Sequence, residues 1–156
     1  MSANAHCLLL DVTDFDRLET VVSETLAQYG PVDVLVNNAG YGHEGGLEES
    51  SLEELRQQFE VNVFAAVALI KGFPPSFRQS RRGHIINITS MCDTITRPGI
   101  SYYCGSKFAL EGISAALGQE RAPFGIFVTA VGAGGVPYRR GRPLNALHPA
   151  QHRRLR

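Results

Sequence analysis

Segments of strand length alternate along the chain with segments that have the apolar spacing of a helix, and this alternation constrains the fold most. Short apolar runs occur at residues 6–10, 32–36, 84–88 and 126–131. Helical patterns separate them, at residues 13–29, from Ser51 to about Pro74, and from Tyr103 to about Glu120. Strands joined through helices pair in parallel, so the pattern predicts an α/β fold with a parallel sheet.

The expected helices also have recognisable ends. Thr13 can cap the first helix, which the Gly-Pro pair at 30–31 ends. Ser51 and Glu54 have the spacing of a capping box at the start of the second helix. That helix is expected to break at the Pro-Pro pair at 74–75, because proline lacks the N–H that a helix interior needs.

Composition indicates one soluble globular unit. The 156 residues are 44% hydrophobic with a net charge of zero. No apolar run reaches the roughly 20 residues of a membrane-spanning helix, and no export signal is expected. Cys7, Cys92 and Cys104 lack the spacing of a disulfide framework or a zinc site, so no metal is predicted. A reducing, cytoplasmic setting is expected.

Charge is distributed unevenly between the two ends of the chain. Residues 132–156 contain six arginines and no acidic residue, whereas residues 1–131 contain nine basic and fifteen acidic residues. We expect 1–131 to form a partial dinucleotide-binding and catalytic domain and 132–156 to be a basic, disordered tail. The tail has three prolines and no aromatic interleaving, so neither a nucleic acid nor a membrane is predicted as its partner.

Tyr103 and Lys107 stand four residues apart on an expected helix, which places both side chains on one face. A nearby ammonium favours phenolate over phenol, so the pair can act as an acid/base device. The same spacing also suits an amphipathic tyrosine beside a solvated lysine.

Three further polar groups can share that site. Ser90 ends an expected strand at the carboxyl edge of the sheet, where open α/β sheets bind ligands, with Thr89 as the neighbouring alternative. Asn62 interrupts an apolar helical stripe and can hold a water or bond to a helix carbonyl. Asp11 can accept a hydrogen bond from an adenine amine or cap the next helix. The small residues around Gly40 allow close approach to a flat ligand or form an ordinary turn.

Together these residues resemble the pattern of the short-chain dehydrogenase/reductase family over nearly all of residues 8–131. The resemblance is carried by Leu10-Asp11-Val12, Asn37-Asn38-Ala39-Gly40, Asn62, Ser90 and Tyr103-Cys104-Gly105-Ser106-Lys107. Ser90 precedes Tyr103 by thirteen residues, and the two match the family in order and spacing.

The resemblance implies an NAD(P)-dependent oxidoreductase that interconverts an alcohol and a carbonyl. The implied roles are Tyr103 as general acid/base, Ser90 orienting the substrate oxygen, Lys107 binding the nicotinamide ribose and lowering the tyrosine pKa, and Asn62 holding a relay water. The implied cofactor contacts are Asp11, Val12, Asn38, Ala39, Gly40, Tyr103 and Lys107. A small-molecule substrate and a homo-oligomer that pairs through the helices after Ser51 and Tyr103 are also implied.

Family members begin with a strand and a glycine-rich turn that receives the cofactor's pyrophosphate. Only residues 1–5 precede His6 here, so we expect a partial, doubly wound Rossmann-like sheet that lacks its first two strands and its C-terminal end. This predicts a gap between the strands at Leu10 and Val34, and no measurable affinity of the chain alone for NADH or NADPH. NAD and NADP both stay open as cofactors, and a non-catalytic truncated remnant is the alternative function.

The C-terminal segment departs from the family as well. Codons for Gly-Ala-Gly at 132–134, read one base later, can encode the expected Glu-Pro-Gly, so a frameshift near residue 132 is one interpretation and a divergent tail is the other. The sequence therefore does not identify the substrate or the residues that line its pocket. His43, Met91 and Tyr102 are candidates for its wall, or ordinary loop and surface residues.

Overall fold

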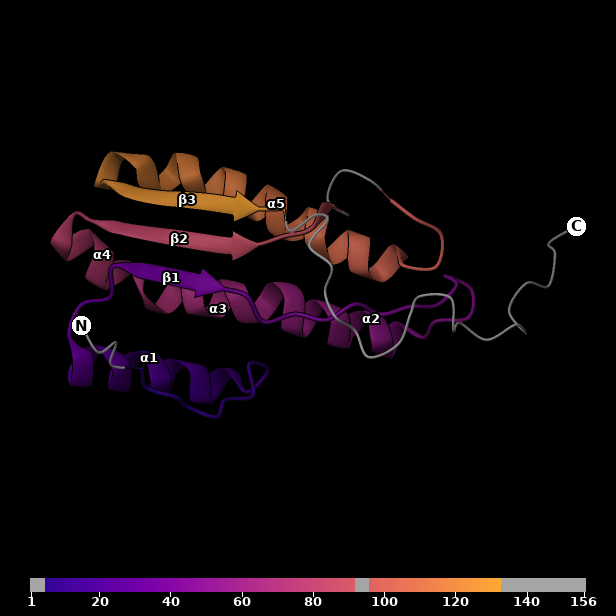
Figure 1. Cartoon of the computed structure of the whole chain (residues 1–156), viewed down its shortest axis with the longest axis horizontal. Coiled ribbons are helices and arrows are strands. Elements are labelled where there is room, and N and C mark those ends of the chain that lie inside the picture. Colours follow the sequence, from indigo (N-terminus) through magenta and orange to yellow (C-terminus); the bar gives the residue numbers. More distant parts are fainter. Residues whose placement is uncertain (1–4, 92–95, 133–156) are drawn as a thin grey trace, which may run out of the picture.

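The computed structural model describes residues 5–91 and 96–132. Within them lies a three-stranded parallel sheet in the order β1-β2-β3, formed by β1 (Val34–Asn37), β2 (Gly83–Ile88) and β3 (Ile126–Val131). Figure 1 shows the three arrows pointing the same way. The predicted α/β class and parallel sheet are confirmed, and β3 has the predicted bounds.

Helices connect the strands. They are α1 (Phe15–Tyr29), α2 (Leu52–Phe59), the π-helix η1 (Glu60–Phe64), α3 (Ala65–Gly72), α4 (Pro74–Ser80), α5 (Ser101–Arg121) and the 3₁₀ helix η3 (Ala122–Phe124). In Figure 1, α3 and α5 lie behind the sheet and no described helix lies in front of it. The sheet therefore buries one face.

The core lies between that face and the helices. Leu35, Ile85 and Ile126 come from the three strands and pack with Phe73 and Phe77 from the helical layer. Phe77 is fully buried, and a Cβ at Gly83 would lie 2.5 Å from its ring. Only glycine lets β2 begin this close to Phe77.

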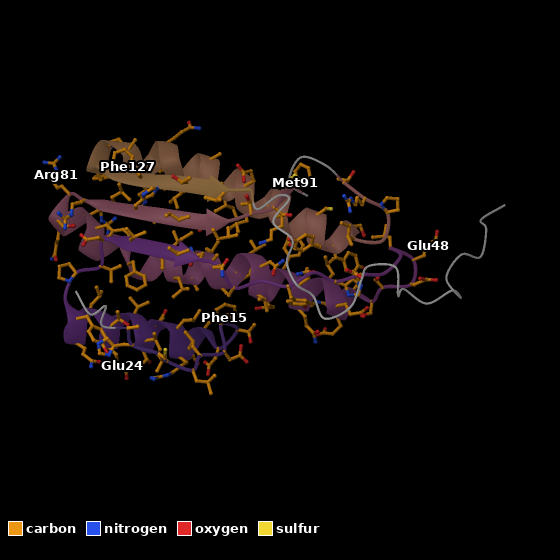
Figure 2. All side chains as sticks on the ribbon, viewed as in Figure 1. Phe15, Glu24, Glu48, Arg81, Met91 and Phe127 are labelled. Atoms are coloured by element: carbon orange, nitrogen blue, oxygen red, sulfur yellow. The ribbon has the colours of Figure 1, made fainter. Side chains whose placement is uncertain are left out.

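On the opposite face the apolar side chains stay exposed. Val34 and Val36 on β1 are 47% and 52% exposed, and Phe127 on β3 is 71% exposed (Figure 2 labels Phe127). Successive side chains of a strand point to opposite faces, so these residues alternate with the buried ones. The outer face is apolar because the strands have the continuous apolar sequence typical of parallel sheets covered on both sides.

The predicted strand at His6–Leu10 is wrong, because residues 5–10 form no strand. Leu9 is fully exposed and Leu8 is 58% exposed. A strand forms only where its backbone can hydrogen-bond to a neighbouring strand. Among the described residues β1 pairs only with β2, and residues 5–10 pair with no strand. Among the described residues β1 is therefore an edge strand, and the predicted gap between two strands is replaced by an unpaired edge at Val34.

The predicted cap of the first helix is also wrong. Asp14, not Thr13, is the N-cap of α1, and its carboxylate accepts from Arg17 N–H at 3.0 Å. Thr13 instead donates its N–H and its hydroxyl to Asp11 Oδ1. A carboxylate is the stronger acceptor at the positive end of a helix, which favours Asp14 as the cap.

The predicted capping box is confirmed, and the second helix runs without a break from Leu52 through α2, η1 and α3 to Gly72, just before Pro74. Ser51 Oγ accepts from Glu54 N–H at 3.2 Å, and Glu54 Oε2 accepts from Ser51 N–H at 2.7 Å. The π-helix η1 then widens the helix around Asn62. Pro74 does not only end the helix; it also starts α4, where its missing N–H costs nothing.

Replacing Glu54 by glutamine should lower stability at neutral pH and not in acid. Hydrogen bonds from Ser51 N–H and Oγ hold the pKa of Glu54 below its ordinary value, with a smaller contribution from His43. A carboxylate with a lowered folded pKa contributes stability above its unfolded pKa and loses it as pH falls through the folded pKa.

Thermal unfolding of the wild type and Glu54→Gln between pH 7 and pH 3 measures this. The wild type should unfold at the higher temperature at pH 7, and the difference should shrink as the pH falls below the unfolded glutamate pKa of about 4.3. Glu53→Gln is the control, because its ion pair with Arg56 is exposed and weak. A difference that widens in acid would contradict the assignment.

Most of the predicted basic tail, residues 133–156, lies outside the described residues, as does the frameshift hypothesis that rests on it. Gly132 is exposed after β3. None of the helices in the described ranges is long and apolar enough to cross a membrane.

Candidate active site

The carboxyl ends of β1 and β2 meet at one edge of the sheet. Asn38, Ala39 and Gly40 follow β1, and Thr89 and Ser90 follow β2. In Figure 2, Met91 lies beyond the arrowhead of β2, and Phe15, the first residue of α1, lies toward the same edge. This edge brings together the sequence-predicted residues that follow β1 and β2.

Lys107 is fixed beside Tyr103 on α5. Its Nζ lies 5.8 Å from the centroid of the Tyr103 ring and donates to the Ile88 carbonyl at 2.8 Å. Lys107 is 6% exposed, whereas Tyr103 is only partly buried. The ammonium is thus held in the interior while the phenol remains accessible.

Asn62 on η1 is 1% exposed, and both polar atoms of its amide bond to the protein. Its Oδ1 accepts from Tyr41 N–H at 3.0 Å, and its Nδ2 donates to the Tyr41 carbonyl at 2.9 Å and to Ser106 Oγ at 3.0 Å. The side chain therefore fixes the loop after Gly40 against α5.

Ser106 is a member of the site that sequence reasoning missed. It is fully buried and donates to the Tyr103 carbonyl at 2.7 Å while it accepts from Asn62. Its place between Tyr103 and Lys107, three residues after the tyrosine, was the available signal. A hydroxyl there can bond back to the preceding turn of the helix.

Ser90 and its alternative Thr89 are both buried, at 8% and 2% exposure. Thr89 N–H donates to the Val131 carbonyl, which extends the β2–β3 ladder past the strand. Thr89 Oγ1 is buried without a hydrogen-bond partner among the described residues.

Gly40 comes close to both Asn62 and Lys107. A Cβ at this position would lie 3.1 Å from Asn62 Oδ1 and 3.6 Å from Lys107 Nζ. The backbone of the loop therefore lies against the buried amide and ammonium with no side chain between them. This fits a flat cofactor ring approaching Lys107 past Asn38, Ala39 and Gly40.

Asp11 and Val12 lie in the loop before α1. Asp11 is exposed, and its Oδ1 accepts from Thr13 N–H at 2.9 Å and Thr13 Oγ1 at 2.7 Å. These hydrogen bonds lower the pKa of the Asp11 carboxyl. Asp11 therefore holds the turn before α1 but does not cap the helix, because Asp14 is its N-cap. Val12 is half-buried.

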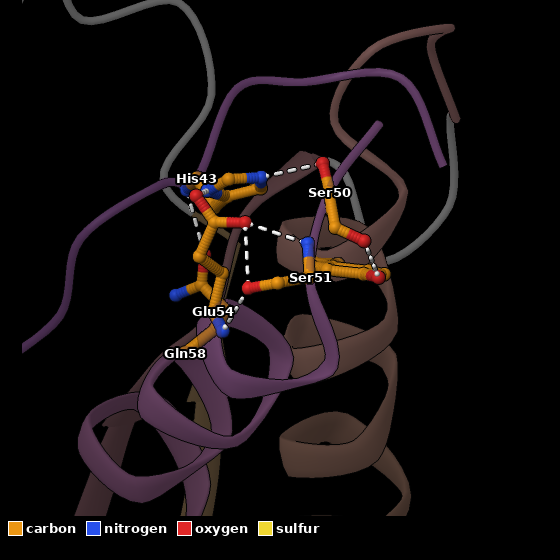
Figure 3. A network of polar contacts seen from close by, with 6 residues as sticks. His43, Ser50, Ser51, Glu54 and Gln58 are labelled. Atoms are coloured by element: carbon orange, nitrogen blue, oxygen red, sulfur yellow. Dashed lines mark hydrogen bonds and ion pairs between the residues drawn. The ribbon is translucent and has the colours of Figure 1, made fainter. Parts of the chain in front are cut away.

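His43 and Tyr102 are joined to each other. Their rings stack with centroids 5.4 Å apart, and His43 Nε2 lies 2.8 Å from Ser50 Oγ. Figure 3 shows this network with Glu54 and Gln58. Sequence reasoning named both rings as wall or loop residues and missed the contact between them. Met91 is 46% exposed.

Tyr41 lies beside the same network and is 43% exposed. Partial burial and the nearby Glu54 carboxylate raise the pKa of its phenol. Tyr41 therefore stays protonated at neutral pH and offers a donor near Gly40.

A separate apolar groove of about 550 Å³ lies between α1 and α3. Its lining includes Phe15, Val22, Phe64 and Gly72, and none of the sequence-predicted site residues. It is an apolar surface of the two helices rather than part of the site.

Known proteins are similar to this chain in sequence and in fold. A family profile described as short chain dehydrogenase matches residues 1–145. A 3-ketodihydrosphingosine reductase of Bacteroides thetaiotaomicron is 41% identical over 127 residues, which cover 81% of this chain and 47% of that protein. An uncharacterised oxidoreductase of Schizosaccharomyces pombe is 38% identical over 125 residues, covering 80% and 53%.

Solved structures of short-chain dehydrogenases are also similar to this chain. A short-chain dehydrogenase from Streptomyces avermitilis superposes with a TM-score of 0.80 at 43% identity, covering 82% of this chain and 47% of that one. A metagenomic short-chain oxidoreductase in complex with NADP gives a TM-score of 0.82 at 31% identity, covering 86% and 62%. The chain spans about half the length of the curated relatives. The partial Rossmann-like fold is confirmed, and the chain belongs to the short chain dehydrogenase family.

Proposed function

We propose that this chain carries the catalytic residues of an NAD(P)-dependent oxidoreductase that interconverts an alcohol and a carbonyl. The observation that carries the proposal is the buried Lys107 ammonium 5.8 Å from the ring of an accessible Tyr103. Both lie at the edge of the sheet where β2 ends near Ser90.

Each residue has a separate task in the proposed reaction. Tyr103 Oη exchanges a proton with the substrate oxygen, and the Ser90 hydroxyl orients that oxygen. The Lys107 ammonium lies beside the Tyr103 ring and can bind a ribose hydroxyl. A nicotinamide cofactor supplies or accepts the hydride when it is bound.

Asn62 acts in this proposal by positioning. Its amide is already bonded to Tyr41 and Ser106, so its side chain can hold a relay water only through the remaining acceptor capacity of Oδ1. Its main contribution is to hold the loop at Gly40 against Lys107.

Residues for a cofactor are present on one side of the site. Asn38, Ala39 and Gly40 would lie along the nicotinamide ring, Tyr103 and Lys107 beside its ribose, and Asp11 and Val12 beside the adenine. The short approach of Gly40 to Asn62 and Lys107 supports this. NADP in one structural relative supports a nicotinamide cofactor, and we keep NAD and NADP as alternatives.

Small-molecule turnover in a chimera tests the proposal. In the chimera, this chain replaces the matching segment of the Streptomyces avermitilis dehydrogenase. The rest of that dehydrogenase supplies the parts of a family member that lie outside the match. NAD(P)H oxidation with a panel of ketones and aldehydes should be measurable. A folded chimera that binds cofactor without turnover would overturn the proposal in favour of the non-catalytic alternative.

Gly40→Ala should raise the cofactor KM of the chimera roughly tenfold or more, because the added methyl displaces Asn62 Oδ1 by a few tenths of an ångström. Gly112→Ala is the matched control. A Cβ at Gly112 meets nothing within 4 Å, and alanine is favoured over glycine within α5. An unchanged cofactor KM in Gly40→Ala would remove Gly40 from the cofactor contact.

We also propose that the protein forms homo-oligomers. Phe64 on η1 and Phe108 on α5 are 49% and 45% exposed, and they lie on the helices through which the family resemblance predicts pairing. Large exposed aromatic side chains are typical of interface cores.

A further inference from the structure

Three residues join the loop after β1 to the start of α5. His43 Nε2 lies 2.8 Å from Ser50 Oγ, the Tyr102 hydroxyl donates to the Ser50 carbonyl at 3.0 Å, and the His43 and Tyr102 rings stack. We call His43, Ser50 and Tyr102 the clasp. Figure 3 shows the His43–Ser50 contact and the adjoining Ser51–Glu54 capping box at the start of α2.

The clasp is tightly packed. Tyr102 is 7% exposed, and the side chain of His43 is 16% exposed. A Cβ at Gly45 would lie 2.5 Å from Ser50 Oγ and 3.0 Å from His43 Nε2, so the loop closes directly over the pair. Gly45 N–H also donates to the Gly99 carbonyl at 2.8 Å, just before α5.

The polar side-chain atoms of the clasp face polar groups of the protein itself. One nitrogen of the His43 ring bonds to Ser50 Oγ, and the other lies 3.9 Å from Glu54 Oε1. The hydroxyl of Tyr102 is engaged with the Ser50 carbonyl. These side chains therefore bind the protein itself, and their effect on chemistry must act through what they hold.

What they hold is the helical turn that carries Tyr103. The N-cap of α5 is Ile100, which makes no side-chain cap hydrogen bond. The first amides of a helix lack intrahelical acceptors, so an uncapped first turn frays readily. Tyr102 lies in this turn, next to Tyr103, and the clasp anchors it to α2 through Ser50.

A second connection reaches Tyr103 from its other side. Gln58 is fully buried, accepts from His43 N–H at 2.7 Å and donates to the Tyr41 carbonyl at 2.7 Å. Asn62 holds the same Tyr41 peptide and donates to Ser106, which bonds to the Tyr103 carbonyl. The loop at residues 41–43 is thus linked to α5 both before and after Tyr103.

We propose that His43 is a positioning residue for Tyr103, acting through the clasp; the inference rests on the proposed function of Tyr103. Tyr102 and Ser50 transmit the effect, because their bonds fix the peptide that precedes Tyr103. The clasp orders the phenol relative to Lys107 without touching substrate or cofactor.

The test has a structural arm and a kinetic arm. In the chain itself, amide hydrogen exchange at residues 104–107, which begin at the first amide of α5 with an acceptor in the helical ladder, should accelerate roughly three- to tenfold in His43→Ala and Ser50→Ala, the effect of losing one hydrogen bond. Ser50→Ala keeps the carbonyl that Tyr102 uses and removes only the partner of His43. His84→Ala is the control, because His84 bonds to Thr129 across β2 and β3.

In the chimera, His43→Ala should lower kcat about tenfold and leave the cofactor KM unchanged, and His43→Asn, which can still bond to Ser50 Oγ, should recover part of kcat. Faster exchange with unchanged kcat would overturn the positioning role and leave a structural one. Unchanged exchange would overturn the clasp. A wild-type chimera without turnover counts against the proposed function, and the exchange arm then decides the clasp alone.

Discussion

Replacing Tyr103 by phenylalanine should lower kcat of the chimera by roughly 10²–10⁴-fold, the usual contribution of a positioned acid/base group. Phenylalanine keeps the ring 5.8 Å from Lys107 Nζ and removes only the hydroxyl that exchanges a proton. The Tyr103 carbonyl accepts from Ser106, and Lys107 donates to the Ile88 carbonyl. Neither hydrogen bond involves an atom of the phenol. Cofactor affinity should therefore stay within about twofold of the wild type.

Steady-state kinetics with a fluorescence titration of NADPH measure both quantities. Tyr29→Phe is the matched control, since Tyr29 is half-exposed at the end of α1, outside the described site. Turnover that survives in Tyr103→Phe would remove Tyr103 from acid/base chemistry. A loss of cofactor affinity equal to the loss in kcat/KM would instead assign it a binding role.

The parts of the fold that depend on local sequence were predictable. The run at 126–131 is preceded by Gly125 at φ 72°, which ends the 3₁₀ helix, and the strand follows with the predicted bounds. Ser51 and Glu54 specify the start of α2 through bonds within four residues. Tyr103 and Lys107 come together because residues four apart share one face of a helix.

Features that depend on distant partners were not predictable in the same way. Residues 6–10 have the composition of a strand, yet strand formation depends on a ladder to a neighbour. His43 and Tyr102 are far apart in sequence, and only the folded loop brings their rings together. The π-helix around Asn62 has no composition signal of its own, although the buried amide at its centre marks the position.

Asn62→Ala should destabilise the chain by about 2–4 kcal/mol, the largest effect expected from a single polar side chain in the site. Three hydrogen bonds are lost, but their consequences differ. The Tyr41 carbonyl keeps Gln58 Nε2 as a donor, and Ser106 Oγ keeps the Tyr103 carbonyl as an acceptor. Tyr41 N–H loses its only protein partner in the described structure and accounts for most of the cost.

Urea unfolding followed by circular dichroism measures the free energy difference. Gln57→Ala is the matched control, because Gln57 lies exposed on α2 and should change stability by less than about 0.5 kcal/mol. Asn62→Asp keeps an acceptor for Tyr41 N–H, loses the donors to the Tyr41 carbonyl and to Ser106 Oγ, and adds the cost of a buried carboxylate. A cost in Asn62→Ala no larger than in Gln57→Ala would mean that the amide does not join the loop to α5. The second connection to Tyr103 would then be absent, and the clasp through His43 would hold that turn by itself.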